Sequence, residues 1–401
     1  MKTFHFDGVI PASKSYFNRA LICASYASVN QAVTLTGKSR CDDVEKMQKA
    51  FQHLKKDSIY DCGSAGTVLR FLALRASRIP GLHILKGHPR LMSRPQEDLN
   101  EIFEQMSVKM QLFSDRLIIQ SPGWKLKNNT LKVNRNKSSQ FISGVLLNAW
   151  NLDFPLHLDW DQNGVSEGYW QMSLQVVKDF GMSLEQNSSG VTISPHSQVQ
   201  IQNYAVESDM SSAFAIAAHA ALNGEALFRQ FPTHTLQPDV VFLQILEKMG
   251  LQVEKNSDHV RLVQKNSEAQ LRGLHWNLNG CPDLFPVLAT LCAFAKGPSR
   301  LDGAPHLIFK ESNRIEKTAE LIRQMGVQTK ILPDGMEIHP PEHLVIPKKA
   351  FEYNPDHDHR LAFAASLLKA KNYPIQILHP EVVNKSFPEF WDILINSSQK
   401  L

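Results

Sequence analysis

The sequence predicts an α/β protein of two similar domains, each built from three strand–helix–strand–helix–strand–strand repeats around three buried helices. Three observations predict this fold. The chain has 401 residues, a length typical of two domains. One unit occurs six times: small polar residues, an apolar helical run, a turn and a short strand. Amphipathic helical segments such as RIEKTAELIRQMG, at residues 314–326, lie between these units.

Each repeat can be marked by the polar residue that opens its apolar helical run. These opening residues are Ser13, Ser64, Ser138, Ser211, Asp283 and Asp358. They recur at about 73 residues, except that the second follows the first after only 51. The first helix of each repeat is apolar almost all round and should be buried, whereas the second should face solvent on one side. Ser, Thr or Asp at these starts would act as N-caps.

The repeat count also predicts the domain limits. Three repeats per domain place the division just before the segment ESDMSSAF. We expect an N-terminal domain at residues 13–205 and a C-terminal domain at residues 206–401, which also receives residues 1–12. The short spacing between the first two repeats predicts that the first domain has one shortened repeat, in which a strand hairpin is lost.

Composition narrows the class of protein. Hydrophobic residues make up 43% of the chain, and the formal net charge is only +4. No run of five like charges occurs, so we expect no nucleic-acid partner. The N-terminus lacks an apolar signal core, no apolar run reaches about 18 residues, and the five cysteines form no CxxC motif. These features predict a cytoplasmic protein with reduced thiols and no membrane span.

Cations gather where helices are expected to begin. A cation at a helix N-terminus opposes the helix dipole, and isolated cases are best explained as solvated surface residues. The repetition instead predicts a site for a strongly anionic small molecule between the domains, since helix N-termini and cations together bind anions. The cations concerned are Lys14, Arg19, Arg94, Lys137, Lys310, Arg314, Arg360 and Lys385.

The segment PDHDHR, at residues 355–360, admits a second interpretation. Two histidines and two aspartates so close together are ligand types that transition metals accept. No distant third ligand accompanies them in the sequence, so we expect a helix cap and an anion contact here, and no metal or other cofactor.

Eight segments, in order along nearly the whole chain, resemble the signature segments of the 5-enolpyruvylshikimate-3-phosphate synthase family. They are PASKSYFNRAL, SAGTVLR, GHPRLMSRPQEDL, SSQFISGVLL, CPDLFPVLATLCAFAKG, KESNRI, DHDHRLAF and KSFPEFW. The resemblance implies two domains of three repeats each and a monomeric enzyme. It also implies transfer of the enolpyruvyl group of phosphoenolpyruvate to the 5-hydroxyl of shikimate 3-phosphate, with release of phosphate.

The resemblance further implies which residues bind and react. Asp283 would be the base for the 5-hydroxyl, Glu311 the second proton carrier, and Lys14 the group that stabilises developing charge. Shikimate 3-phosphate would be held by Lys14, Ser15, Arg19, Ser138, Ser139, Ser166, Tyr169, Asp283, His306 and Lys310. Phosphoenolpyruvate would be held by Lys14, Gly66, Arg94, Gln140, Arg314, His359, Arg360 and Lys385.

The chain also departs from the family pattern. Ser64 and His306 stand where the family commonly has asparagine, Asn313 where it has aspartate, and Phe71 where it often has proline. Two alternatives follow. A related enolpyruvyl transferase acts on a UDP-sugar, but it should show a cysteine before its ARP segment, and GHPRLMS has none. A non-catalytic anion-binding descendant would not need both Asp283 and Glu311.

Overall fold

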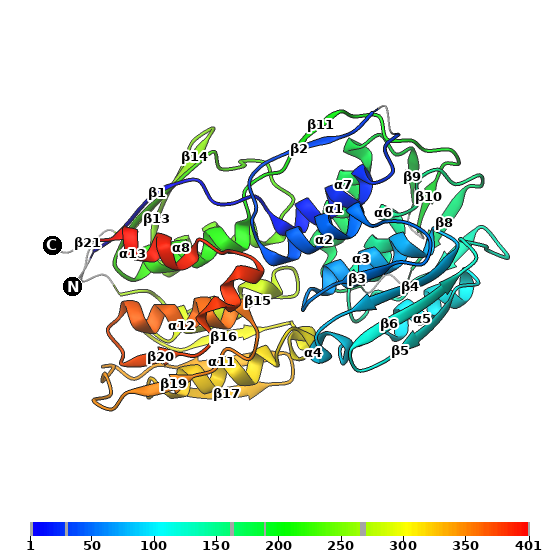
Figure 1. Cartoon of the computed structure of the whole chain (residues 1–401). Helices are drawn as coiled ribbons and strands as arrows, with labels where there is room; N and C mark the ends of the chain where they lie inside the picture. Colours follow the sequence, from blue (N-terminus) through cyan, green and yellow to red (C-terminus); the bar gives the residue numbers. More distant parts are fainter. Residues whose placement is uncertain (1–2, 29–30, 161–163, 188–189, 265–269, 400–401) are drawn as a thin grey trace. The chain divides into compact units, whose positions relative to one another are not determined.

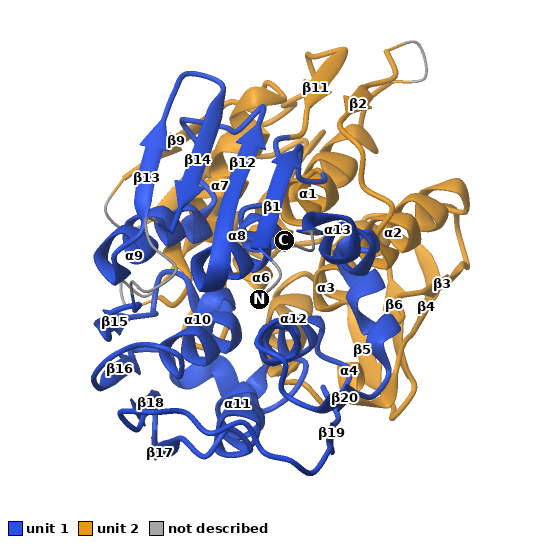
Figure 2. Cartoon of the chain, turned by 90° about the vertical axis from the view of Figure 1, so that its left-hand side faces the viewer, with its two compact units in different colours: residues 1–11, 207–401 blue, residues 12–206 orange. Residues whose placement is uncertain are grey.

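The structure, a computed structural model, describes residues 3–28, 31–160, 164–187, 190–264 and 270–399. The chain divides into two compact units, coloured separately in Figure 2. Unit 1 comprises residues 1–11 and 207–401, and unit 2 comprises residues 12–206. The limits predicted from the repeats are 13–205 and 206–401, with residues 1–12 added to the second domain.

Unit 2 contains seven helices among its described residues, labelled in Figure 1: α1 (Lys14–Ala24), α2 (Asp42–Gln52), α3 (Gly66–Ser77), α4 (Pro89–Met92), α5 (Glu97–Gln105), α6 (Gln140–Leu147) and α7 (Glu167–Asp179). Its strands are β2 (Thr34–Thr36), β3 (Ile59–Asp61), β4 (Gly81–Lys86), β5 (Lys109–Leu112), β6 (Arg116–Ser121), β7 (Thr130–Lys132), β8 (Leu156–Asp159), β9 (Leu184–Gln186), β10 (Gly190–Ile193) and β11 (Asn203–Ala205).

The sheets of unit 2 follow the predicted repeat. Two have four strands, in the orders β3-β4-β6-β5 and β7-β8-β10-β9. In each, the first two strands are parallel across a buried helix, and a hairpin then adds two antiparallel strands. Among the described residues, the third sheet contains only β2 and β11, which are parallel. The shortened repeat predicted for the first domain is therefore confirmed, because this sheet has no hairpin.

Unit 1 has the helices α8 (Met210–Asn223), α9 (Phe242–Met249), α10 (Phe285–Cys292), α11 (Arg314–Arg323), α12 (His359–Ala370) and α13 (Phe390–Ser397), with short 3₁₀ helices η1 (Pro238–Val241), η2 (Pro282–Leu284), η3 (Pro305–Phe309) and η4 (Pro380–Lys385). Its strands are β1 (Thr3–Gly8), β12 (Gly224–Arg229), β13 (Gln252–Lys255), β14 (His259–Val263), β15 (His275–Asn277), β16 (Ser299–Asp302), β17 (Gln328–Leu332), β18 (Gly335–His339), β19 (Phe351–Tyr353), β20 (Ile375–Ile377) and β21 (Ser398–Gln399).

Both ends of the chain join one sheet of unit 1. Its strand order is β13-β14-β12-β1-β21, so β1 supplies the strand that precedes α8 in the repeat pattern. β1 runs parallel to β12, with Phe4 opposite Gly224, and β21 pairs with its other edge. The remaining sheets are β15-β16-β18-β17 and the two-stranded β19-β20. Unit 1 thus repeats the design of unit 2.

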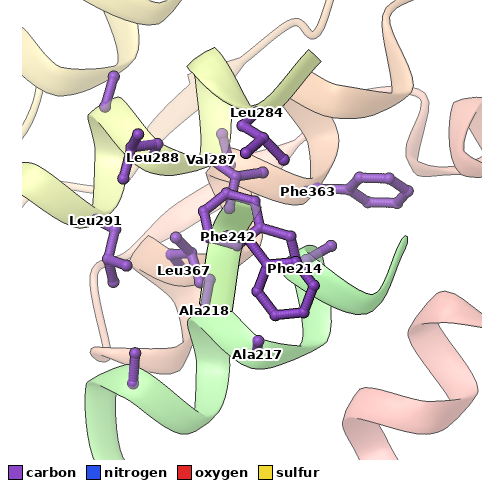
Figure 3. Close-up of a cluster of buried hydrophobic side chains, with 14 of the residues drawn as sticks. Phe214, Ala217, Ala218, Phe242, Leu284, Val287, Leu288, Leu291, Phe363 and Leu367 are labelled. Atoms are coloured by element: carbon purple, nitrogen blue, oxygen red, sulfur yellow. The ribbon is translucent and has the colours of Figure 1, made fainter. Parts of the chain in front are cut away.

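Three helices form the centre of each unit, as the sequence predicts. In unit 1, α8, α10 and α12 meet through apolar side chains, among them Phe214, Leu288 and Leu367 (Figure 3). In unit 2, α3 is buried from Val68 to Ser77 and packs on α6. Burying apolar surface on all sides of these helices supplies most of the stabilisation. Polar groups lie instead at the N-terminal ends of these helices.

The N-caps correct part of the sequence prediction. Ser13, Asp209 and Asp358 do accept a hydrogen bond from the first turn of α1, α8 and α12. The other buried helices do not begin at their marked residues. The N-caps of α3, α6 and α10 are Ala65, Ser139 and Leu284, none with a capping side chain, and Ser211 lies inside α8. The N-cap residues of α3 and α10 thus make no capping bond with their side chains, whereas at α6 the marked residue Ser138 accepts from the Gln140 backbone N–H.

Among the described helices, none is both long and apolar enough to cross a membrane. All five cysteines are buried and carry free thiols.

Candidate active site

Asp283 lies at the centre of a charged cluster in unit 1. It sits in η2, directly before α10, with its side chain 19% exposed. Arg314 Nη1 donates to Asp283 Oδ1 at 2.8 Å, and Arg360 Nη2 donates to Asp283 Oδ2 at 2.7 Å. Lys310 Nζ lies 3.9 Å from Asp283 Oδ1. Three cations from two segments of the chain, residues 310–314 and Arg360, thus surround one carboxylate.

Glu311 belongs to the same cluster. Its two carboxylate oxygens face different cations: Oε2 accepts from Arg314 Nη2 at 3.0 Å, and Oε1 lies 3.3 Å from Lys385 Nζ. Its side chain is 15% exposed. Arg314 therefore bridges the two carboxylates that the resemblance assigns to proton transfer.

Asp358 fixes the position of the Arg314 side chain. Its carboxylate caps α12 and accepts from Arg314 Nε at 2.8 Å, and it also accepts from Ser312 Oγ at 3.2 Å. The Arg314 side chain is only 1% exposed and that of Asp358 is fully buried. A guanidinium group fixed on three sides cannot easily rotate, so the geometry of Asp283 and Glu311 is set by Arg314.

The local sequence explains these positions. Asn313 caps α11 by accepting from the Glu316 backbone N–H, which places Arg314 at the first helical position and the pair 310–311 in the preceding turn. Pro282 opens η2. Lys385 ends η4 and is buried. Asp283 lies in η2, and Arg314 and Lys385 lie at the ends of α11 and η4. Lys310 and Glu311 lie in the turn between η3 and α11.

The charges in this cluster shift the pKa values of its members. Burial alone would raise the pKa of Asp283, but the positive charges of Arg360, Lys310 and Arg314 outweigh burial and hold it well below its usual range. Burial would lower the pKa of Arg314, but Asp358, Glu311 and Asp283 raise it well above its usual value. Asp283 is therefore ionised when no substrate is bound.

His306 lies beside the cluster, within η3. It is 5% exposed, and neither ring nitrogen has a hydrogen-bond partner. Burial, helped by the nearby charge of Lys310, lowers its pKa to about 3. The imidazole is thus neutral at physiological pH, with one N–H donor and one acceptor nitrogen that no described residue satisfies.

Asp239 is a group that the sequence reasoning missed. It lies in η1, is 2% exposed, and accepts a hydrogen bond from Ser211 Oγ, whereas its Oδ1 atom has no partner. Burial and the negative charge of Asp283 raise its pKa to about 7. The segment LQPDVV does not distinguish this aspartate from an ordinary acidic residue at a helix start, so no pattern in the sequence points to it.

In unit 2, the predicted residues Lys14 and Arg19 share the first turns of α1. Lys14 Nζ lies 3.1 Å from Asp43 Oδ2, a partner that the sequence reasoning also missed. Arg19 is 2% exposed and donates to Ser173 Oγ and to the backbone oxygens of Ser15 and Tyr169. Burial lowers the pKa of Arg19 to about 10. No carboxylate among the described residues forms an ion pair with it, so its charge is available to an anion.

Gly66 and Arg94 are in close contact. A Cβ atom added at Gly66 would lie 2.7 Å from Arg94 Nη1, and the Arg94 Nε atom is buried without a hydrogen-bond partner. Glycine at the start of α3 therefore makes room for a guanidinium group. A side chain at position 66 would therefore meet Arg94, another residue of the predicted phosphoenolpyruvate set.

Gln140 is the first residue of α6, which packs on α3. Its Oε1 atom accepts from Arg70 Nη1 at 2.8 Å, and its backbone N–H donates to Ser138 Oγ at 3.2 Å. Arg70 also bonds Gln96 Oε1 and the Pro95 carbonyl, and it stacks on an aromatic ring of α6. Arg70 was not predicted as a functional residue. It fixes the orientation of Gln140 and of the segment that follows Arg94.

The remaining predicted residues of unit 2 lie at helix starts. Ser139 is the N-cap of α6 and is 3% exposed. Ser166 is the N-cap of α7 in a left-handed conformation, with φ of 59°. Tyr169 follows in the first turn of α7 and is half-buried. Neither serine uses its side chain as a cap, which leaves both hydroxyl groups for other contacts.

Each unit thus assembles its own share of the predicted site. Unit 1 brings together Asp283, His306, Lys310, Glu311, Arg314, Arg360 and Lys385. His359 stands next to them, 1% exposed, with its ring edge against Phe363. Unit 2 carries Lys14, Ser15, Arg19, Gly66, Arg94, Ser138, Ser139, Gln140, Ser166 and Tyr169.

The structure does not favour the metal interpretation of residues 355–360. Asp358 is engaged by Arg314 and the α12 backbone. Across the part of the chain that the structure describes, no group of three His, Cys, Asp or Glu side chains is arranged to hold a metal ion. The chemistry available is that of cations, hydroxyl groups and carboxylates: binding of anions and transfer of protons.

Comparisons with known proteins agree with this chemistry. A family model described as EPSP synthase (3-phosphoshikimate 1-carboxyvinyltransferase) matches residues 9–394. A 3-phosphoshikimate 1-carboxyvinyltransferase of Syntrophobacter fumaroxidans is 33% identical over 334 residues, which cover 82% of this chain and 78% of the relative. One of Methanocaldococcus jannaschii is 30% identical over 431 residues, covering 98% and 96%.

Solved structures show the same fold. An EPSP synthase of Acinetobacter baumannii matches with a TM-score of 0.77 at 21% identity, covering 100% of this chain and 97% of that one. The enolpyruvyl transferase NikO of Streptomyces tendae matches with a TM-score of 0.73 at 15% identity, covering 99% and 95%. The predicted two-domain α/β fold is therefore confirmed.

Proposed function

This chain belongs to the EPSP synthase (3-phosphoshikimate 1-carboxyvinyltransferase) family, and we propose from that premise how its own residues carry out the reaction. It is an enzyme that transfers the enolpyruvyl group of phosphoenolpyruvate to the 5-hydroxyl of shikimate 3-phosphate and releases phosphate. Both substrates carry a phosphate and a carboxylate group. Four anionic groups require an unusual number of cations, and this need explains why cations gather at the helix starts.

We assign the two substrates to the residues of both units. Shikimate 3-phosphate contacts Lys14, Ser15, Arg19, Ser138, Ser139, Ser166, Tyr169, Asp283, His306 and Lys310. Phosphoenolpyruvate contacts Lys14, Gly66, Arg94, Gln140, Arg314, His359, Arg360 and Lys385. The buried Arg19 guanidinium without a carboxylate partner supports the first set, and the unpartnered Arg94 Nε atom supports the second.

The observation that carries the mechanism is the pairing of Asp283 with Arg360 and Arg314 in the unliganded protein. A substrate carboxylate or phosphate brings negative charge to the same guanidinium groups. This charge offsets the positive charges that hold down the pKa of Asp283, and the carboxylate becomes a stronger base while Arg314 keeps its position. Substrate binding therefore raises the basicity of Asp283 once the substrate is in the site.

The proton transfers then follow. Asp283 removes the proton of the 5-hydroxyl as its oxygen attacks the central carbon of phosphoenolpyruvate, and Glu311 donates a proton to the methylene carbon. The resulting methyl group returns a proton to Glu311, which is protonated before and after the cycle, as the carbon–oxygen bond to phosphate breaks. The proton taken from the 5-hydroxyl passes from Asp283 to the departing phosphate, which leaves as hydrogen phosphate. Lys14 stabilises the charge that develops on the leaving phosphate. No metal or cofactor takes part in these proposed steps.

We further propose that the enzyme acts as a monomer in the cytoplasm, with no nucleic-acid or membrane partner. The small net charge and the lack of charge runs support this proposal. Light scattering of the purified protein would test it, and a stable dimer would contradict it.

The proposed roles are tested by phosphate release with both substrates. We expect turnover by the wild-type enzyme and a loss of about 10²–10⁴-fold in kcat for Asp283→Ala and for Glu311→Ala. A cooperative melting transition like that of the wild type serves as the control for folding. A wild-type protein that binds shikimate 3-phosphate without turnover would instead support the non-catalytic alternative. Full activity in either variant would refute the proposed role of that residue.

A further inference from the structure

A pocket of about 780 Å³ lies in unit 1, away from the charged cluster. Its walls come from both ends of the chain, because Phe4 of β1, Trp391 of α13 and Ser398 of β21 all line it. The C-terminal ends of α8 and α12 and the strand β20 complete the walls. This volume is in the range of pockets that bind drug-sized molecules.

The pocket combines apolar walls with one sign of charge. Phe4, Ile375, Ile377, Trp391 and Leu394 are among its apolar lining residues. The charged side chains among the described lining residues are Lys369 and Lys371, and no aspartate or glutamate is among them. Of all described residues at the pocket, only lysines thus offer a full charge to a ligand.

Lys371 is the better placed of the two lysines. It is half-buried, and its Nζ atom donates to the Leu222 carbonyl at the end of α8, at 3.0 Å. Burial lowers its pKa, and no carboxylate contributes to that shift. An ammonium group has three donors, so one carbonyl does not saturate it. A ligand anion would supply the charge partner that the described residues do not.

The rest of the polar lining is neutral. His219 is buried, shares a hydrogen bond of 2.8 Å between its Nε2 atom and Ser366 Oγ, and is uncharged because burial lowers its pKa to about 3. Trp391 already donates its indole N–H to the Pro380 carbonyl at 2.8 Å. The indole ring is therefore fixed in orientation and presents an apolar surface.

We infer that this pocket is a binding site for a small amphipathic carboxylate, with its apolar or aromatic body against Trp391 and Ile377 and its carboxylate at Lys371. The site is distinct from the substrate site. Ala370, which lines the pocket, is about 15 Å along α12 from Arg360 at the opposite end of the helix. Pro380 and Lys385 stand likewise at opposite ends of η4.

The test uses two probes of the same shape, 2-naphthoate and its neutral amide 2-naphthamide. Binding is measured by calorimetry on the full-length enzyme, with saturating shikimate 3-phosphate and inorganic phosphate present to occupy the substrate site. We expect 2-naphthoate to bind and 2-naphthamide to bind about tenfold more weakly, because the amide lacks the charge-assisted contact.

Variants then locate the site. Lys371→Met should weaken 2-naphthoate about tenfold and leave 2-naphthamide unchanged, whereas Lys371→Arg should retain most of the affinity. Ala370→Phe, at an exposed lining position, should reduce the binding of both probes by filling the pocket. Lys348→Met, an exposed lysine outside the lining, is the matched control and should change neither.

Several results would overturn the inference. They are absence of 2-naphthoate binding, equal affinity for the two probes, unchanged 2-naphthoate binding in Lys371→Met, or displacement of the probe by shikimate 3-phosphate and phosphate. Enzyme turnover reports folding of each variant independently, because none of these positions belongs to the substrate-binding set. Should a variant fail to turn over, the two probes on the wild-type enzyme still decide the matter.

Discussion

At the scale of single residues, Arg314 connects the two carboxylates that would transfer protons and fixes their positions. It bonds Asp283, Glu311 and Asp358 at once while 1% exposed. A buried charge is tolerable only when it is well paired, and here three carboxylates share the task. The planar guanidinium group can bridge them because its five N–H donors point in fixed directions.

Replacement of Arg314 by lysine tests this bridging role. A single ammonium group cannot hold both Asp283 and Glu311, so we expect kcat to fall by about 100-fold or more. Steady-state phosphate release measures the effect. Arg300→Lys, in an exposed ion pair with Asp302 and Glu337, is the control and should keep its activity. If Arg314→Lys kept the wild-type kcat, charge alone would suffice and the bridging geometry would be unimportant.

Asp239 gives a pH-dependent prediction about stability. Its folded pKa of about 7 exceeds the ordinary value of 3.8, so the folded protein binds more protons than the unfolded chain between these values. Stability should therefore fall as pH rises from about 4 to 7. Asp239→Asn removes this effect, so the excess of its melting temperature over that of the wild type should grow by several degrees between pH 5 and pH 8.

Thermal unfolding of both proteins across pH 5–8 measures the difference. Asp392→Asn, at an exposed position, should show no such trend. A difference between Asp239→Asn and wild type that is the same at pH 5 and pH 8 would show that Asp239 does not titrate in this range.

At the scale of elements, the buried helices pack their apolar residues in the core and carry proposed site residues at their N-terminal ends. The apolar part of α3 is fixed by packing, while its first residue, Gly66, admits Arg94. The same design recurs at α10 and α12, where Asp283 and Arg360 stand at the ends of buried helices. Packing thus places the polar groups with the accuracy of a rigid scaffold.

Gly66→Ala should disturb this arrangement selectively. The added methyl group would lie 2.7 Å from the flexible end of Arg94, so the guanidinium group must move while the backbone stays. We expect the KM for phosphoenolpyruvate to rise about tenfold and the melting temperature to change little. The control is Gly280→Ala, where an added Cβ would meet no atom within 4 Å. An unchanged KM would show that Arg94 does not bind this substrate.

The sequence predicted elements better than it predicted contacts, and the reason is physical. Periodicity reports burial, so the six buried helices and the shortened repeat could be recognised before the structure was known. Periodicity does not report which side chains meet. Asp43 beside Lys14, Arg70 beside Gln140 and Asp239 near Asp283 join segments far apart in the chain. No spacing in the sequence could have identified these pairs.

The N-caps illustrate the same limit. A serine before an apolar run predicts a cap, yet at α6 the cap residue makes no capping bond with its side chain. Whether a hydroxyl group caps a helix or faces a ligand depends on a turn of the backbone, which local sequence does not determine.

At the scale of the whole molecule, the proposed substrate contacts come from both compact units. Lys14 and Lys310, both assigned to shikimate 3-phosphate, lie in unit 2 and unit 1 respectively. A ligand that binds the folded state raises the melting temperature through mass action. If both units contact the ligand, loss of either lysine must reduce that effect.

We therefore expect shikimate 3-phosphate to raise the melting temperature of the wild-type enzyme by several degrees, and Lys14→Met and Lys310→Met each to remove most of the shift. Lys348→Met is the control and should keep it, because this exposed lysine has no assigned role. A full shift in Lys310→Met would mean that unit 1 does not contribute this contact.

The central claim is that Glu311 and Asp283 divide the proton transfers between them, with Glu311 serving the carbon atom. Incorporation of solvent deuterium into the enolpyruvyl methylene group, followed by proton NMR in D₂O with both substrates, tests this division most directly. The methyl group formed by protonation can return either isotope, so the wild-type enzyme should incorporate deuterium. Glu311→Gln should lose incorporation by about 10²–10⁴-fold while still binding shikimate 3-phosphate. Incorporation by Glu311→Gln at the wild-type rate would contradict the account.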